Sequence, residues 1–371
     1  MIMDQFKNIL NYAEKNIVAI NKSALNDVDV LIFSWLSYFH LNENVFKKNI
    51  FGSIPIKEIY NAKYLDTMLF DVTDILNSKK LLSLLAASPR FRDVEIVYYE
   101  EVANKKREKQ FSAMTFRIGK GKYVVAFRGT DHTFVGWKEN LNMSFLKSIP
   151  AQVAAKNYLN KVMKKYSGTY YIGGHSKGGN LAVYASSFID DKYKKRIKRI
   201  YNFDGPSLNS KLINDENYKM IKARIKKFVP QSSVVGMCFE KTLEYKIIKS
   251  NGIGLLQHIP FTWEIANNKL KILKNTTFDS KMFKAGINAL VDDLSDEELK
   301  LFANSIYNVV NATKVKTFEE FLSDFNKNSM IVLKEINNFN DKIKETMKKV
   351  FKTYISEMFN IEKLIAKKGK A

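Results

Sequence analysis

Apolar residues recur at helical spacing at both ends of the chain. Residues 1 to about 90 are predicted to be mainly helical, and the clearest apolar helix covers 27–38. Past residue 275 the pattern is helical again. Two sequences there, Ser295–Glu298 and Thr317–Glu320, fit capping boxes that begin helices. Helical segments therefore flank a middle section whose pattern is different.

The middle section contains short strand-like runs that alternate with helical stretches. Five such runs are Val94–Glu101, Phe111–Ile118, Lys122–Phe127, Ile197–Phe203 and Ile225–Val229. A helical stretch covers about 150–166, and a further strand-like run, 169–173, follows it. Alternating strands and helices favour a mainly parallel sheet that is covered on both faces. We therefore expect an α/β core.

The predicted division of the chain has three parts. A helical N-terminal segment that includes a candidate lid covers residues 1–90, and the α/β core covers 91–274. A helical C-terminal extension covers 275–371.

The most specific motif in the chain is Gly174-His175-Ser176-Lys177-Gly178, which joins the run 169–173 to a helical stretch at 180–189. In this strand–turn–helix context, a G-x-S-x-G sequence forms a nucleophile elbow. The turn is so sharp that only small residues fit beside the serine, and it lifts the hydroxyl above the edge of the sheet. We therefore interpret Ser176 as a catalytic nucleophile and the core as an α/β-hydrolase fold.

Composition narrows the class of protein. The chain has 371 residues, and 46% of them are apolar, which is enough for a packed core. Its single cysteine, Cys238, cannot form an internal disulfide and is typical of a reducing compartment. The N-terminus lacks the features of a signal peptide, and no apolar stretch approaches the roughly 20 residues that span a bilayer. These features predict a soluble, cytoplasmic protein.

The net charge of +22 has more than one interpretation. Lysines are scattered along the chain, which favours an ordinary solvated surface. The alternative is attraction to anionic lipid, so that the protein makes peripheral contact with a membrane. Nucleic-acid binding is disfavoured, because no zinc-ligand spacing or nucleic-acid module accompanies the basic clusters at 105–107 and 192–199.

A nucleophilic serine needs a base, and the candidates are four histidines. His40 and His132 precede the serine, whereas in α/β-hydrolases the order is serine, acid, histidine. His175 lies inside the elbow, where its backbone direction carries the ring away from the serine. Chain order and elimination therefore leave His258 as the base.

The base in turn needs a carboxylate that fixes its tautomer. Among the acidic residues between Ser176 and His258, Asp204 alone directly follows a hydrophobic strand, and it precedes Gly205-Pro206. Catalytic groups gather at the carboxyl ends of strands in open α/β sheets. We therefore choose Asp204 as the triad acid; the alternative is a turn-forming aspartate.

An oxyanion hole needs two backbone N–H groups that point at the developing negative charge. The residue after the nucleophile, Lys177, supplies one in this motif. The strand-like run 122–127 ends near Gly129, so Thr130 is the candidate for the second. Arg128, which precedes Gly129, has an alternative structural role in which its guanidinium holds the loop in place.

At these positions the chain resembles the class 3 lipases. The resemblance rests on Phe127-Arg-Gly-Thr130, the downstream Trp137 and the motif 174–179. More specifically, the chain is similar to an uncharacterised bacterial family of lipase-like serine hydrolases, found largely in Firmicutes. That likeness covers roughly residues 10 to 265 and adds the segments 126–131, 137–145, 203–206, 229–236 and Gln257-His258. It implies hydrolysis of an acyl ester.

One departure from the lipase pattern concerns the acid. Class 3 lipases usually carry their triad aspartate after the strand that here ends at Val229, and the segment 229–236 contains no acidic residue. Either Asp204, one strand earlier, has taken over the role, or the site lacks an acid.

The sequence therefore predicts a serine esterase or lipase that uses Ser176, His258 and Asp204, with the amides of Lys177 and Thr130 in the oxyanion hole. Its substrate would be an acyl ester or lipid, and neither a metal nor an organic cofactor is implied. The alternative is a non-catalytic hydrolase-like scaffold that binds a protein partner or an anionic membrane surface. The sequence does not indicate an oligomeric state.

Overall fold

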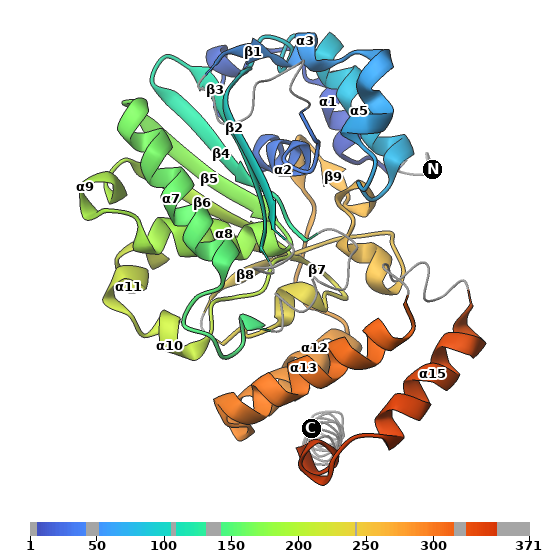
Figure 1. Cartoon of the computed structure of the whole chain (residues 1–371). Helices are drawn as coiled ribbons and strands as arrows, with labels where there is room; N and C mark the ends of the chain where they lie inside the picture. The colour runs from blue at the N-terminus through green and yellow to red at the C-terminus, as the bar shows by residue number, and fades with distance from the viewer. Residues whose placement is uncertain are drawn as a thin grey trace, which may run out of the picture.

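The computed structural model describes residues 6–41, 52–104, 109–130, 142–241, 243–314 and 324–346. Within these ranges the centre of the fold is a nine-stranded sheet with the strand order β1-β2-β3-β4-β5-β6-β7-β8-β11 (Figure 1). The strands are β1 (Ile54–Pro55), β2 (Glu95–Asn104), β3 (Lys109–Gly119), β4 (Lys122–Phe127), β5 (Thr169–His175), β6 (Ile197–Phe203), β7 (Ile225–Pro230), β8 (Tyr245–Ile248) and β11 (Ile272–Leu273). Two further short strands, β9 (Ile265–Ala266) and β10 (Lys269–Leu270), pair with each other.

The central strands β4 to β8 run parallel to one another. Strands β1 to β4 form an antiparallel extension at one edge, and β11 pairs antiparallel with β8 at the other. The predicted parallel sheet is therefore the centre of a larger mixed sheet.

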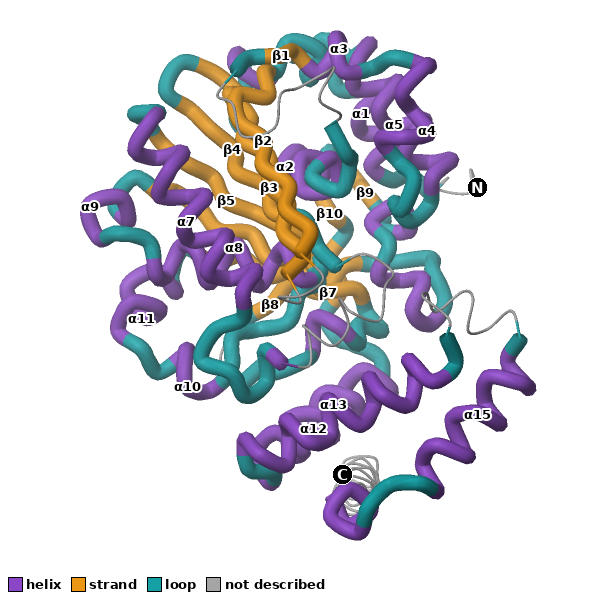
Figure 2. Tube along the Cα trace, in the orientation of Figure 1, coloured by secondary structure: helices purple, strands orange, loops and turns teal. Residues whose placement is uncertain are grey.

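Helices cover both faces of this sheet (Figure 2). The N-terminal part contributes α1 (Ile9–Lys15), α2 (Asp27–Leu36), α3 (Ile56–Ile59), α4 (Leu65–Met68) and α5 (Ile75–Ala87). The core contributes α7 (Pro150–Lys165), α8 (Lys177–Phe188), α9 (Asp191–Lys194), α10 (Ser210–Ile213) and α11 (Glu216–Lys222). The chain then continues into three C-terminal helices, α12 (Phe278–Asp293), α13 (Asp296–Ala312) and α15 (Phe325–Asn337).

Alternation along the strands divides the core into two layers. On β4, Val124 and Ala126 face the helices α1, α2 and α5, whereas Val125 and Phe127 face α7, α8 and α11. Side chains of a strand point alternately to its two faces, so a strand that is apolar throughout requires a cover on both sides. This three-layer arrangement is an α/β-hydrolase fold, as the sequence predicts.

Helical additions lie at both ends of the chain, as expected. The predicted capping box at Ser295 is present, because its backbone N–H donates to Glu298 Oε2 at 2.8 Å and the Glu298 N–H donates to Ser295 Oγ at 3.3 Å. None of the helices in the described ranges combines the length and the apolar character that crossing a bilayer requires. Several residues of the sequence analysis, including 105–107, His132, Trp137 and 317–320, lie outside the described residues.

Candidate active site

Ser176 lies at the sharp junction between β5 and α8. Its backbone has φ 57° and ψ −135°, a positive-φ conformation that is rare for a residue with a side chain. Such strain persists only where the surroundings hold it, and it is concentrated at functional sites. Here the Ser176 N–H donates to the Phe203 carbonyl at 2.9 Å, and the Ser176 carbonyl accepts from Gly179 N–H at 2.9 Å. The backbone therefore makes the sharp strand–turn–helix junction that the sequence predicts.

Close backbone contacts explain the glycines of the elbow. A Cβ at Gly174 would lie 2.2 Å from the carbonyl carbon of Gly178. A Cβ at Gly178 would lie 2.0 Å from the Phe127 carbonyl oxygen at the end of β4. Real Cβ atoms do not approach other atoms this closely, so both positions require glycine for space.

The sheet register brings Asp204 beside the elbow. His175 pairs with Phe203 across the parallel strands β5 and β6, so the next residues, Ser176 and Asp204, leave neighbouring strands at the same edge. Asp204 also has a positive φ, 51°, and is 1% exposed. The sequence placed Asp204 at the carboxyl end of a strand, and this is where it lies.

His258 meets Asp204 from a distant part of the chain. It ends the short 3₁₀ helix η5 (Gly254–His258), and its Nδ1–H donates to Asp204 Oδ2 at 2.6 Å. This bond leaves Nε2 as the nitrogen that can accept a proton. In the described part of the chain no hydrogen bond joins the Ser176 hydroxyl to the His258 ring. Catalytic hydrogen bonds often tighten only when substrate is bound.

A second set of donors, which the sequence analysis did not include, holds the other oxygen of Asp204. The Ser233 hydroxyl donates to Oδ1 at 2.5 Å, and the Gly236 N–H donates to the same oxygen at 3.2 Å. Both residues lie in the segment 229–236, where the lipase pattern would place the acid. The sequence marked the segment 229–236 through the family likeness and the missing acid, but nothing in it indicated that Ser233 contacts Asp204.

His175 packs against His258. The His258 carbonyl can only accept, so His175 Nε2 carries the proton and donates to it at 2.7 Å. His175 Nδ1 then accepts from the Tyr38 hydroxyl at 2.9 Å. The two imidazole rings lie 4.4 Å apart between centroids. The His175 ring thus joins Tyr38 to the His258 backbone and holds that backbone in place.

Complete burial, assisted by the nearby His258, lowers the pKa of His175 well below its usual value. In the unfolded chain His175 binds a proton near pH 6.5, whereas in the folded chain it stays neutral to lower pH. The unfolded state therefore gains protons first, and stability is lost as the pH falls below about 6.5. The contribution of this one group is up to about 1.4 kcal/mol per pH unit. We expect urea unfolding at several pH values to show a weaker acid dependence for His175→Gln than for the wild type; equal dependence in both would contradict this account.

The two candidate oxyanion donors lie on either side of the elbow. Lys177 is the first residue of α8 and is buried. A Cβ at Gly129 would lie 2.8 Å from the His175 carbonyl oxygen, so the chain that leads to Thr130 runs against the elbow. The structure thus brings Thr130 and Lys177 to the same edge of the sheet as Ser176.

Arg128 supports the structural interpretation of its guanidinium. It donates to Glu101 Oε1 at 2.8 Å, and the same carboxylate oxygen lies 2.7 Å from His40 Nδ1. Burial alone would raise the pKa of Glu101, but the hydrogen bond with His40 and the charge of Arg128 lower it to about 2. For His40 the effects have the opposite sign. Burial alone would lower its pKa, but the hydrogen bonds with Asp71 and Glu101 raise it. His40 therefore belongs to this ion-pair cluster and not to the candidate triad.

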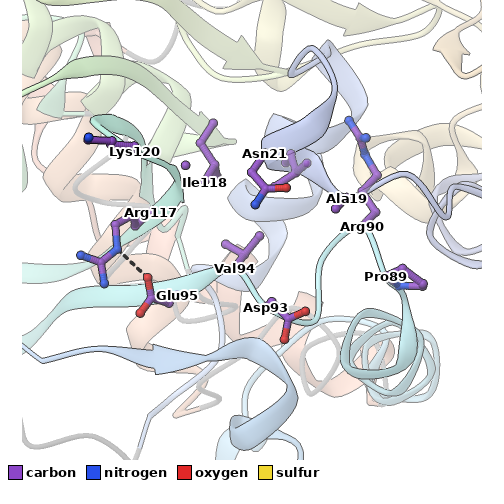
Figure 3. Close-up of a pocket in the computed structure, with 12 residues that line it drawn as sticks. Ala19, Asn21, Pro89, Arg90, Asp93, Val94, Glu95, Arg117, Ile118 and Lys120 are labelled. Carbon is purple, nitrogen blue, oxygen red and sulfur yellow. Dashed lines mark hydrogen bonds and ion pairs between the residues drawn. The ribbon is translucent and has the colours of Figure 1, made fainter.

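A cavity of about 340 Å³ lies at the other end of the strands, away from Ser176 (Figure 3). It is lined by the turn between β3 and β4, by the start of β2 and by residues 19–21. Most of the charged side chains in its lining form ion pairs. These pairs are Arg90–Asp29, Lys57–Asp93 and Arg117–Glu95. The turn precedes β4, whereas Ser176 follows β5, so this cavity is not part of the candidate active site.

Comparisons with known proteins give one family match and low similarity to solved structures. A family model described as Mbeg1-like matches residues 85–308. A search of curated proteins gives no match. Among solved structures, MDLA from Penicillium cyclopium, in a mutant form, is 12% identical with a TM-score of 0.41, covering 66% of this chain and 83% of that one. A structure described as a fungal lipase is also 12% identical with a TM-score of 0.41, covering 67% and 84%. A fungal lipase–inhibitor complex is 14% identical with a TM-score of 0.34, covering 53% and 83%.

Proposed function

This chain belongs to the Mbeg1-like family, and from the geometry of its site we propose that it is a serine hydrolase that cleaves acyl esters. The observation that carries the proposal is the 2.6 Å bond between His258 Nδ1 and Asp204 at the edge where the strained Ser176 leaves the sheet. A nucleophile on an elbow, beside a histidine that is oriented by a buried carboxylate, is the arrangement that activates a serine.

The proposed reaction proceeds through an acyl-enzyme. Ser176 Oγ attacks the ester carbonyl while His258 Nε2 takes its proton, and the amides of Lys177 and Thr130 stabilise the oxyanion. His258 then passes the proton to the leaving alcohol. Water attacks the acyl-enzyme by the same steps, and Asp204 keeps His258 in the required tautomer throughout.

Apolar side chains beside the base support a substrate with a hydrophobic acyl group. Ile253 and Leu256 precede His258 in the same short segment and are 84% and 58% exposed. Exposed large apolar groups beside a reactive site favour contact with an acyl chain or a lipid. With the net charge of +22, they also support a peripheral enzyme that acts at an anionic membrane surface.

The test is covalent labelling of the wild-type protein by a fluorophosphonate probe, with and without detergent micelles. We expect one probe per chain, located on Ser176 by mass spectrometry of the peptide, and faster labelling at neutral than at acid pH because the base must be unprotonated. Folded protein that is not labelled in either condition would contradict the proposed function. The alternative would then be the non-catalytic scaffold, which is tested by measuring the binding of the same protein to anionic liposomes.

A further inference from the structure

The loop that follows β7 contributes no acid of its own but surrounds the acid of the neighbouring strand. Ser233 Oγ–H and Gly236 N–H both donate to Asp204 Oδ1, at 2.5 and 3.2 Å, while Oδ2 receives the His258 Nδ1–H. The carboxylate is thus held from two sides. Oδ1 accepts hydrogen bonds from the loop, and Oδ2 accepts the hydrogen bond from His258.

The direction of the Ser233 hydroxyl is fixed by its surroundings. The Gly236 N–H also lies 3.1 Å from Ser233 Oγ and donates to it, so the serine proton is directed to Asp204. Ser233 is only 2% exposed, and a Cβ at Gly236 would lie 2.3 Å from Asp204 Oδ1. Hydrogen bonds to a buried carboxylate are among the stronger ones in proteins.

Two other segments hold the loop in place. Ser280 on α12 donates its hydroxyl to the Ser233 carbonyl at 2.7 Å, and Thr277 N–H, just before α12, donates to the Gln231 carbonyl at 2.8 Å. On the other side, Ser232 N–H donates to Gln257 Oε1 at 3.0 Å, one residue before the base. The loop therefore connects the acid, the segment that carries the base and the C-terminal helix.

We propose that Ser233 is a positioning residue for the Asp204 carboxylate, and that α12 keeps Ser233 in place through Ser280. The proposal rests on the proposed function, in which Asp204 must hold one tautomer of His258. Without the hydroxyl, Oδ1 keeps only the longer contact to Gly236, and the carboxylate is free to turn. In the class 3 lipase pattern, the segment that corresponds to 229–236 carries the triad acid. In this chain the same segment would orient Asp204, which follows the neighbouring strand β6.

The experiment compares the fluorophosphonate labelling rates of Ser233→Ala, Ser233→Thr and Ser187→Ala as a function of pH. Ser187 is the matched control, because it is a buried serine whose hydroxyl donates to the Val183 carbonyl, away from Asp204. We expect Ser233→Ala to react about tenfold more slowly, consistent with the loss of one hydrogen bond to a charged group. We also expect the acid limb of its pH profile to move to lower pH, because a carboxylate that turns away from His258 stabilises the protonated imidazole less. Ser233→Thr should restore both, and Ser280→Ala should act in the same direction by about threefold.

A second measurement does not depend on activity. The proton between His258 Nδ1 and Asp204 should give a low-field NMR signal in the wild type and in Ser187→Ala, and this signal should broaden or disappear in Ser233→Ala. If the wild type is not labelled, the proposed function fails and the NMR signal alone decides the role of Ser233. A Ser233→Ala protein with an unchanged signal, or with the wild-type labelling rate and pH profile, would overturn the proposal. An unaffected Ser280→Ala would overturn the part assigned to α12.

Discussion

Replacement of Ser176 by alanine is expected to abolish ester hydrolysis, with a loss of at least about 10⁴-fold, and to prevent fluorophosphonate labelling. The nucleophile is the one group whose hydroxyl forms the covalent intermediate, and in triad enzymes its removal leaves only the contribution of the oxyanion hole and substrate binding. The measurement is release of a chromophoric alcohol from short- and long-chain esters, together with gel detection of the labelled protein.

The control for Ser176→Ala is Ser187→Ala, which changes a buried serine on the helix that follows the elbow. Ser187→Ala should hydrolyse esters at the wild-type rate. Because alanine keeps the Cβ of serine, it bears the same backbone strain at φ 57°, so Ser176→Ala should fold like the wild type, which circular dichroism and urea unfolding can check. Residual hydrolysis within tenfold of the wild type would show that another residue is the nucleophile.

Replacement of Asp204 by asparagine should lower the labelling rate by about 10³- to 10⁴-fold. The surroundings fix how the new amide must lie. Ser233 and Gly236 both donate to Oδ1, so the amide oxygen of asparagine takes that position and its NH₂ faces His258. The amide would then donate to Nδ1, forcing the proton of His258 onto Nε2. A base protonated on Nε2 cannot accept the proton of Ser176.

The matched control is Asp215→Asn, an aspartate that caps α11 and lies away from the triad. Its labelling rate should stay near that of the wild type. If Asp204→Asn is labelled at more than a tenth of the wild-type rate, Asp204 is not the triad acid, although Ser176 could still be the nucleophile. Labelling by each variant over a range of probe concentrations separates weaker binding from slower reaction.

The central strands could be predicted closely from the sequence, because they are apolar on both faces and bounded by polar turns. The predicted strands Lys122–Phe127 and Ile197–Phe203 coincide with β4 and β6. The strand β8 was missed, since four residues with a lysine among them give too short a pattern. The two-residue strands at the edges, such as β11, have no periodicity at all; their pairing depends on tertiary contacts.

For the candidate site, chain order and elimination indicated His258, and placement at the end of a strand indicated Asp204; the structure brings the two side chains to 2.6 Å of each other. The support around them could not be predicted in the same way. Ser233 and Ser280 are 47 residues apart and carry no motif, so only the folded chain shows that they touch. The contact of His175 with the His258 carbonyl was hidden for a similar reason, because it depends on where a distant loop crosses the elbow.

The connection between α12 and the loop at 231–233 has a consequence for a chain that is still being synthesised. Folding during synthesis proceeds from the N-terminal side, so the elbow with Ser176 emerges from the ribosome well before His258, and α12 emerges later still. Under the roles proposed above, a nascent chain would expose its nucleophile without a fully oriented base. The enzyme would reach full reactivity only after Ser280 has docked, so that acyl transfer begins when the fold is nearly complete.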